Sequence, residues 1–339
     1  MRATVLTDAA LAKQAGRFVW LSIDTENEKN AAFLDRYPWQ AVPTFEVIDA
    51  KTEKIAYSWI GAIDLAGLLV RFDEAEAAFR RPEATVAASP SSLDAGVLDL
   101  SLAGKHEECA LLALKLLPDL PPGSVKANVA STGLDCALSS PEGPKWRPVA
   151  LFMLEVTTRE ALDYDGLLDD DRSGLYGALV DARDRQHDEV GGKARAGEWL
   201  DWLNAQAMGA PSVEARAALD GYRVSAALRA GAPERVLVAI QASERDLPND
   251  YNPPARLATL LRELGRYDEA LAASDRALAK VYGPRTITLW EARATIFEKK
   301  GDPEGAKGAL KQAIAFASTL PPSERTKRAV ARLEKRLIE

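Results

Sequence analysis

The chain has 339 residues, of which 47% are hydrophobic and 27% are charged, a composition typical of a globular protein with about two domains. Its formal net charge of −7 argues against nucleic acid as a partner. No apolar run reaches the ~18 residues of a membrane span, and residues 1–8 lack the apolar core of a signal peptide. As written, the chain is therefore expected to be cytoplasmic with no membrane partner, and export stays open if the true N-terminus lies upstream of Met1.

Residues 1–81 contain the patterns of an α/β domain. A helix capped by Thr7 and stopped by Gly16 is followed by a continuous apolar run, which is typical of a buried strand. Further along, the polar turn 51–54 separates two apolar runs, and this arrangement predicts a β-hairpin. The predicted elements are helix 7–15, strand 18–24, helix 25–37, strand 44–49, strand 55–59 and helix 63–79.

The second of these strands is led by Val42-Pro43-Thr44. Proline has no N–H group for a strand ladder, so it fits at the first residue of a strand and not inside it. An aliphatic residue, proline and threonine at this place resemble the cis-proline loop of the thioredoxin family, and the order of elements also resembles that fold. The resemblance implies that Val42, Pro43 and Thr44 present their backbone to an extended peptide. The sequence does not show the isomer of the Val42–Pro43 bond.

The chain departs from the thioredoxin pattern because it contains no Cys-x-x-Cys. In that family a central strand and the two cysteines precede the point that corresponds to Met1. We therefore expect a thioredoxin-like domain over residues 1–81 that lacks its first strand. Two explanations stay open: the start codon is placed too late, or the domain has lost its chemistry. The first makes the full-length protein a thiol-disulfide oxidoreductase; as written, the chain has no catalytic residues.

A linker is expected at residues 82–92, and residues 93–339 carry helical patterns. When the chain is aligned on a recurring short motif that begins with glycine, here called the repeat phrase, it shows a period of 34–36 residues, clearest over 217–320. Each phrase begins with a glycine for a tight turn, and a small residue follows five positions later. The pattern resembles the tetratricopeptide repeat, which implies stacked helical hairpins with a concave binding face. The phrases begin at Gly231, Gly265 and Gly301, and the same frame fits Gly104.

Between residues 125 and 210 the helices continue without a secure repeat frame. We predict helices over 125–139, 148–161, 173–189 and 195–207. A polar, basic amphipathic helix from Pro322 to Glu339 reads as a cap on the array.

Few residues suggest chemistry. Cys109 and Cys136 could form a redox pair, but Cys109 occupies a repeat's small-residue position, so we expect two buried structural thiols. Asp169-Asp170-Asp171 resembles the start of a calcium loop, yet position twelve is Val180 where glutamate is required. An acidic linker before a helix capped by Ser173 is the simpler interpretation.

His106 and His187 stand among charged residues and read as surface residues. Two cysteines and two histidines are too few for a tetrahedral zinc site without carboxylate help. We therefore expect no metal and no cofactor. The sequence predicts a scaffold that binds a protein or peptide on the concave face of its repeats, and at Val42–Thr44.

Overall fold

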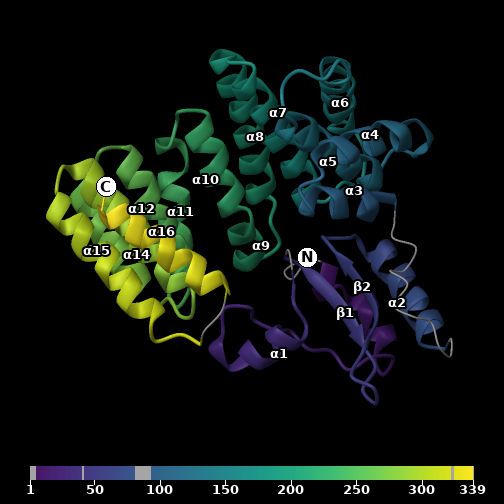
Figure 1. The fold of residues 1–339 in the computed structure, drawn as a ribbon, viewed down its shortest axis with the longest axis horizontal. Coiled ribbons are helices and arrows are strands. Elements are labelled where there is room, and N and C mark those ends of the chain that lie inside the picture. The colour runs from purple at the N-terminus through teal and green to yellow at the C-terminus, as the bar shows by residue number, and fades with distance from the viewer. Residues whose placement is uncertain (1–4, 40–41, 81–92, 322–323, 339) are drawn as a thin grey trace. The chain divides into compact units, whose positions relative to one another are not determined.

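A computed structural model describes residues 5–39, 42–80, 93–321 and 324–338 (Figure 1). Contacts divide the chain into two compact units. The first unit comprises Met1–Arg17 and Trp39–Trp199, and the second comprises Phe18–Pro38 and Leu200–Glu339. The expected linker 82–92 lies outside the described residues, so the division into domains at that place stays a prediction. Residues 18–38, which we assigned to the first domain, belong by their contacts to the second unit.

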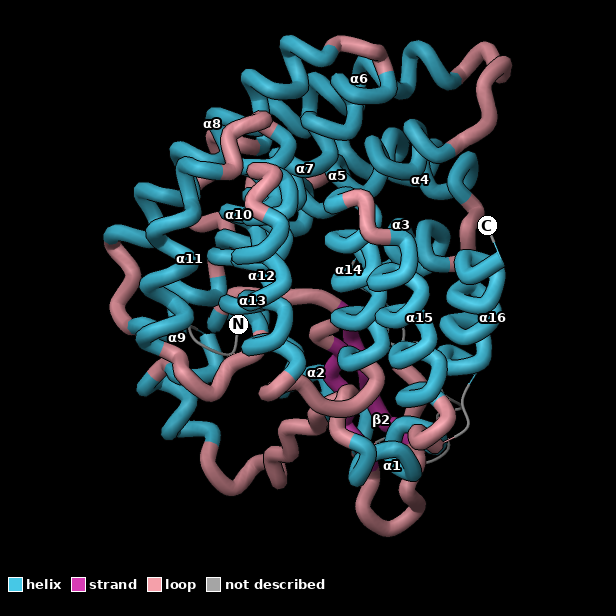
Figure 2. Tube along the Cα trace, turned by 90° about the vertical axis from the view of Figure 1, so that its left-hand side faces the viewer, coloured by secondary structure: helices cyan, strands magenta, loops and turns pink. Residues whose placement is uncertain are grey.

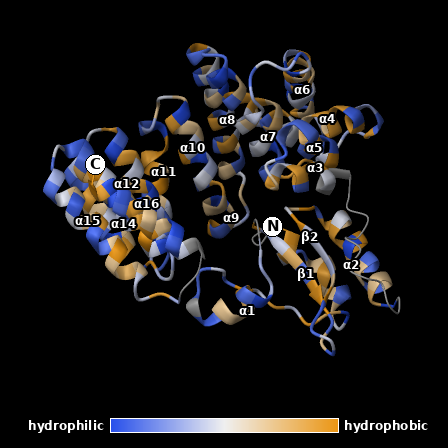
Figure 3. Cartoon of the chain, viewed as in Figure 1, coloured by the Kyte–Doolittle hydropathy of each residue, from blue (hydrophilic) through white to orange (hydrophobic). Residues whose placement is uncertain are grey.

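The first unit contains the predicted hairpin. β1 (Thr44–Ile48) and β2 (Ile55–Ile60) pair antiparallel, and the ring of Phe45 stacks on that of Trp59 with centroids 4.6 Å apart. Figure 3 shows hydrophobic residues along both strands and along α2 (Leu65–Phe79). Asp64 caps α2 by accepting a hydrogen bond from the N–H of Gly67 at 2.7 Å. The hairpin and the following helix are therefore confirmed.

The predicted strand 18–24 is wrong. Among the described residues the sheet has two strands, β1 and β2, and residues 19–24 have no regular structure. Val19 is 91% exposed and Leu21 is 73% exposed. An apolar run becomes a strand only where a neighbouring strand satisfies its backbone groups, and the sequence pattern cannot show whether that neighbour is present.

The two early helices are shorter than predicted. Residues Ala9–Gln14 form a 3₁₀ helix that is capped by Asp8 and not by Thr7. The predicted helix 25–37 is reduced to a 3₁₀ turn at Glu28–Asn30 and α1 (Ala31–Arg36). The cause is Asp24, whose side chain accepts a hydrogen bond from the N–H of Glu26 at 2.9 Å and so favours a turn over a helix there.

From residue 93 the described chain is helical, as Figure 2 shows. The four helices predicted between 125 and 210 are confirmed to within a few residues at most of their ends. The helices of the first unit, with the last shared between the two units, are α3 (Leu93–Leu102), α4 (His106–Leu116), α5 (Ser124–Ser139), α6 (Arg147–Ala161), α7 (Asp169–Arg185) and α8 (Glu189–Met208).

The core of this helical group lies where α4 and α5 cross. Gly133 of α5 lies against Ala113 of α4, and an added Cβ would stand 2.4 Å from the Cβ of Ala113 and 3.1 Å from Leu154. At the same crossing Cys109 and Cys136 form a disulfide, with their Cα atoms 6.0 Å apart. Both residues are fully buried or nearly so.

The prediction of two separate buried thiols is therefore half wrong: the residues are buried, but they are bonded to each other. Their 27-residue separation says nothing about whether two helices cross at these positions, and only the crossing brings the side chains together. Over the described residues, no helix is both long enough and apolar enough to span a membrane.

The second unit is a stack of helical hairpins. Each hairpin packs on the next, and the first helices of successive hairpins also touch one another. α16 packs on α15 and buries Leu333. Besides α1, the helices of this unit are α9 (Val213–Ala218), α10 (Asp220–Arg229), α11 (Glu234–Asp246), α12 (Asn252–Glu263), α13 (Tyr267–Leu278), α14 (Arg285–Lys300), α15 (Pro303–Ala317) and α16 (Glu324–Ile338).

The glycines of the repeat phrase occupy the turn of each hairpin. All four have a positive φ, a conformation that favours glycine because side chains with a Cβ clash there: 70° at Gly104, 69° at Gly231, 71° at Gly265 and 83° at Gly301. The small residues five positions later are buried against the facing helix; they are Cys109, Val236, Ala270 and Ala306. The repeat frame read from the sequence is confirmed.

Candidate functional site

The hairpins of the second unit form an open groove with a volume of about 450 Å³. Its walls come from α11 and α13, the second helices of two successive hairpins, and its floor is α12 between them. Leu257 and Leu261 provide an apolar floor and are 2% and 5% exposed. The wall residues are Gln241, Glu244, Arg245, Glu269, Ala272 and Arg276.

One ion pair connects the two walls. Arg276 of α13 donates two hydrogen bonds to Glu244 of α11, at 2.7 Å and 3.0 Å, in a paired geometry that fixes the guanidinium. This hydrogen bonding raises the pKa of Arg276. Arg245, Glu269 and Gln241 add further polar groups above the leucines. An open groove with charged walls over a nearly buried floor suits a charged segment of a partner better than a small uncharged ligand.

Sequence analysis missed Glu244 and Arg276, although a signal was present. Opposite charges recur at one spacing, two residues short of the shortest repeat spacing: Arg276 pairs with Glu244, 32 residues earlier, and Lys300 pairs with Asp268, also 32 residues earlier. A search for opposite charges 32 residues apart would have found both pairs.

Val42, Pro43 and Thr44 lie at the beginning of β1. The Val42–Pro43 peptide bond is cis, and the Val42 side chain is 71% exposed. The carbonyl of Pro43 accepts a hydrogen bond from the N–H of Gly61 at 2.9 Å, which continues the pairing of β1 with β2. Within the described part of the chain, β2 is the strand paired with β1. A role for these three residues in binding a peptide stays a prediction.

The aspartate run is helical. α7 begins at Asp169, so Asp169, Asp170 and Asp171 form its first turn. Carboxylates are stabilising there because they lie at the positive end of the helix dipole. The expectation of a helix capped by Ser173 is wrong, because Ser173 lies inside α7, is buried, and has its hydroxyl 3.4 Å from the indole nitrogen of Trp199. Burial raises the pKa of Asp171.

Neither histidine lines the groove. His187 is exposed after the end of α7, as predicted. His106 is half-buried at the start of α4, with its Nδ1 atom enclosed, so it is less exposed than predicted.

Comparison with known proteins supports the repeat assignment. The tetratricopeptide repeat family matches residues 251–319, a range that begins just before α12 and ends after α15. The chain therefore carries a tetratricopeptide repeat in this region, and repeats of this kind expose extended surfaces that bind other proteins. No family match covers residues 1–81, and no curated protein matches the chain.

Among solved structures, the chain is similar to a crystal structure of BtubC (BKLC) from P. vanneervenii. The two are 14% identical with a TM-score of 0.40, and the match covers 69% of this chain and 95% of the other.

Proposed function

We propose that this protein is a scaffold whose repeat unit binds a partner protein through the groove between α11 and α13. The observation that supports this function best is the open groove with charged walls, two of whose three helices lie in the region that matches the tetratricopeptide family. The charged groups of its walls, Glu244, Glu269 and Arg276, favour a partner that carries complementary charges. An alternative surface for the same scaffold function is the concave face of the repeat array, where the partner protein would bind instead.

The charge of the groove wall provides the test. Changing Arg276→Glu places a third acid beside Glu244 and Glu269, so a partner selected by this wall should lose about 10-fold or more in affinity. The partner is first isolated by affinity purification on the wild-type chain, and its Kd for both chains is then measured by calorimetry.

Lys311→Glu is the matched control, because it makes the same change of charge at an exposed position of α15, outside the groove. Circular dichroism checks that both variants keep their helix content. Equal affinities for the Arg276→Glu and Lys311→Glu chains would contradict binding in this groove.

A second proposal concerns β1. We propose that β1, β2 and α2 are part of a thioredoxin-like domain, and that Val42–Thr44 receives an extended peptide by strand addition. The exposure of Val42 beside the start of β1 supports this proposal.

Peptides that bind the wild-type chain are first selected from a random library. Changing Val42→Asp should lower their affinity about 10-fold, because a charge opposes an apolar contact at this position. Val70→Asp, at a half-exposed site on α2, is the control. Identical peptide binding by the two variants would exclude the β1 edge.

A further inference from the structure

Two tyrosines of the repeat unit bind two acidic residues from a distant part of the chain. The hydroxyl of Tyr251, just before α12, donates to the carboxylate of Glu26 at 2.9 Å. The hydroxyl of Tyr282, in the loop before α14, donates to Asp24 at 2.8 Å. The two rings meet edge to face with centroids 6.2 Å apart. We call this pair the two-tyrosine site, and residues 18–36 the strap.

The backbone also takes part in this contact. Gly283 is buried with a φ of 59°, and a Cβ added to it would stand 1.8 Å from the carbonyl oxygen of Glu26. The loop between α13 and α14 can therefore receive the strap backbone only because residue 283 has no side chain. The strap enters as a turn, since Asp24 accepts hydrogen bonds from the N–H of Glu26 and, through its carbonyl, from the side chain of Asn30 at 2.9 Å.

Polar contacts hold the strap at the two tyrosines, and its apolar side chains are at most partly buried. Of the strap side chains whose burial is described, none is buried, and Val19, Trp20 and Leu21 are between half and almost fully exposed. The helices beneath it are packed tightly, with Leu257 and Leu260 almost or fully buried. A segment with few buried apolar contacts opens at a low free energy, whereas the repeat unit under it stays folded.

The hydrogen-bond donors of the site suit an acidic occupant. Arg285 and Arg256 interact electrostatically with Tyr251, and Asp220 and Asp250 offset part of the charge of Arg256. Hydrogen bonding to Glu26 adds to burial in raising the pKa of Tyr251, and hydrogen bonding to Asp24 raises that of Tyr282. Both hydroxyls therefore remain donors at neutral pH, and donors suit carboxylates.

We propose that the two-tyrosine site recognises an acidic segment of the form Asp-x-Glu in a partner protein, and that the strap is the chain's own occupant, which the partner displaces. The inference rests on the proposed scaffold function and names a second site with its partner chemistry. A strap joined to its site competes at a high effective concentration, so a free acidic segment binds weakly until the strap is released.

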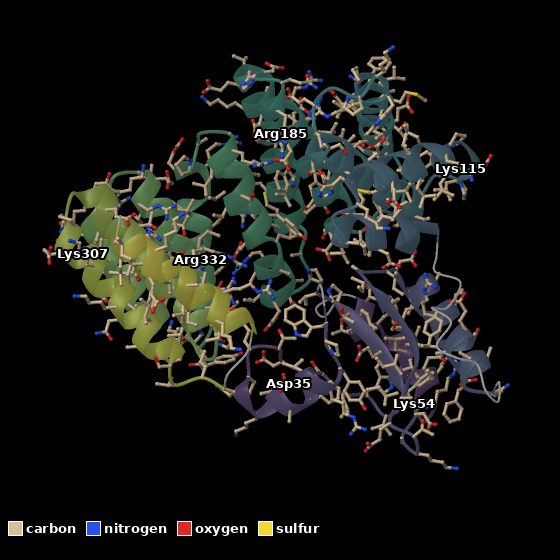
Figure 4. All side chains as sticks on the ribbon, viewed as in Figure 1. Asp35, Lys54, Lys115, Arg185, Lys307 and Arg332 are labelled. Carbon is tan, nitrogen blue, oxygen red and sulfur yellow. A yellow bond between two sulfur atoms is a disulfide. The ribbon has the colours of Figure 1, made fainter. Side chains whose placement is uncertain are left out.

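The test uses a fluorescent peptide with the sequence of residues 22–30, added to the full-length chain and followed by anisotropy. The variant D24A/E26A removes both carboxylates from the strap and should bind the peptide at least 10-fold more tightly than the wild type. Adding Y251F/Y282F to this variant should abolish that gain. D35A, which removes an exposed acid on α1 that Figure 4 labels, should behave as the wild type.

Three results would overturn the inference: equal affinity of D24A/E26A and the wild type, unchanged binding after Y251F/Y282F, or equal binding of a peptide with Asn and Gln at the two acidic positions. A second measurement does not need the peptide. Gly283→Ala should expel the strap and speed tryptic cleavage after Lys29, which is exposed, at least several-fold. Unchanged cleavage would contradict the close approach at Gly283.

Failure here is distinct from failure of the scaffold proposal. If the peptide does not bind D24A/E26A while a partner still depends on Arg276, the groove functions and the two-tyrosine site does not. If neither is observed, both proposals fail.

Discussion

Replacing Cys109 and Cys136 together with alanine is expected to lower the free energy of unfolding of the first unit by about 3 kcal/mol. The two residues are 27 apart, and the disulfide removes the corresponding loop-closure entropy from the unfolded chain. For a unit of this size the loss corresponds to a fall in Tm of roughly 6–12 °C. Scanning calorimetry of the oxidised protein measures it.

The reduced wild-type chain is the control for this prediction, because it keeps both sulfur atoms and loses only the bond. Its Tm should fall close to that of the double variant. The intact mass of the untreated protein should lie about 2 Da below that of the reduced protein, as a disulfide requires. An oxidised wild type with the same Tm as the double variant would show that the bond contributes nothing to stability.

The second large effect is expected at Gly133. In an exposed helix, changing glycine to alanine stabilises by roughly 0.5–1 kcal/mol, because glycine loses more backbone entropy on folding. At Gly133 the sign should reverse, since the new Cβ would stand 2.4 Å from the Cβ of Ala113 and α4 would have to move away. We expect Gly133→Ala to destabilise by about 1–3 kcal/mol, the usual cost of overpacking a core.

Gly174→Ala is the matched control, because Gly174 is exposed on α7 in the same unit and has open space where its Cβ would stand. It should raise the free energy of unfolding by roughly 0.5–1 kcal/mol. Urea unfolding of the three chains measures both changes. If Gly133→Ala is as stabilising as Gly174→Ala, the close crossing of α4 and α5 is wrong.

Close helix crossings and binding sites of this kind cannot be predicted from the sequence, because they depend on which residues of other elements pack against a given side chain. Gly133 looks like any glycine within a helical pattern, as Gly174 does. Tyr251 and Tyr282 lie in repeat loops without an evident function, and their acidic partners are more than 200 residues away. The groove has the same character: Glu244 and Arg276 carry a periodic signal, but only the packing of α11, α12 and α13 opens a space between them.

The sequence by itself determined the hairpin repeat. Gly104, Gly231, Gly265 and Gly301 mark turns whose positive φ requires glycine locally, and the helices between them follow from local periodicity. The β1–β2 hairpin also followed from local patterns. Each of these features depends on residues close together in the chain, so the order of residues is enough to specify it.

Only the tertiary structure decided the fate of residues 18–24, the pairing of the two cysteines and the binding of the strap at Tyr251 and Tyr282. An apolar run forms a strand only beside another strand, and two cysteines form a bond only where their helices cross. The strap lies on the repeat unit because Gly283 leaves room for its backbone and two hydroxyls meet its carboxylates. These are long-range conditions, and the sequence pattern does not contain them.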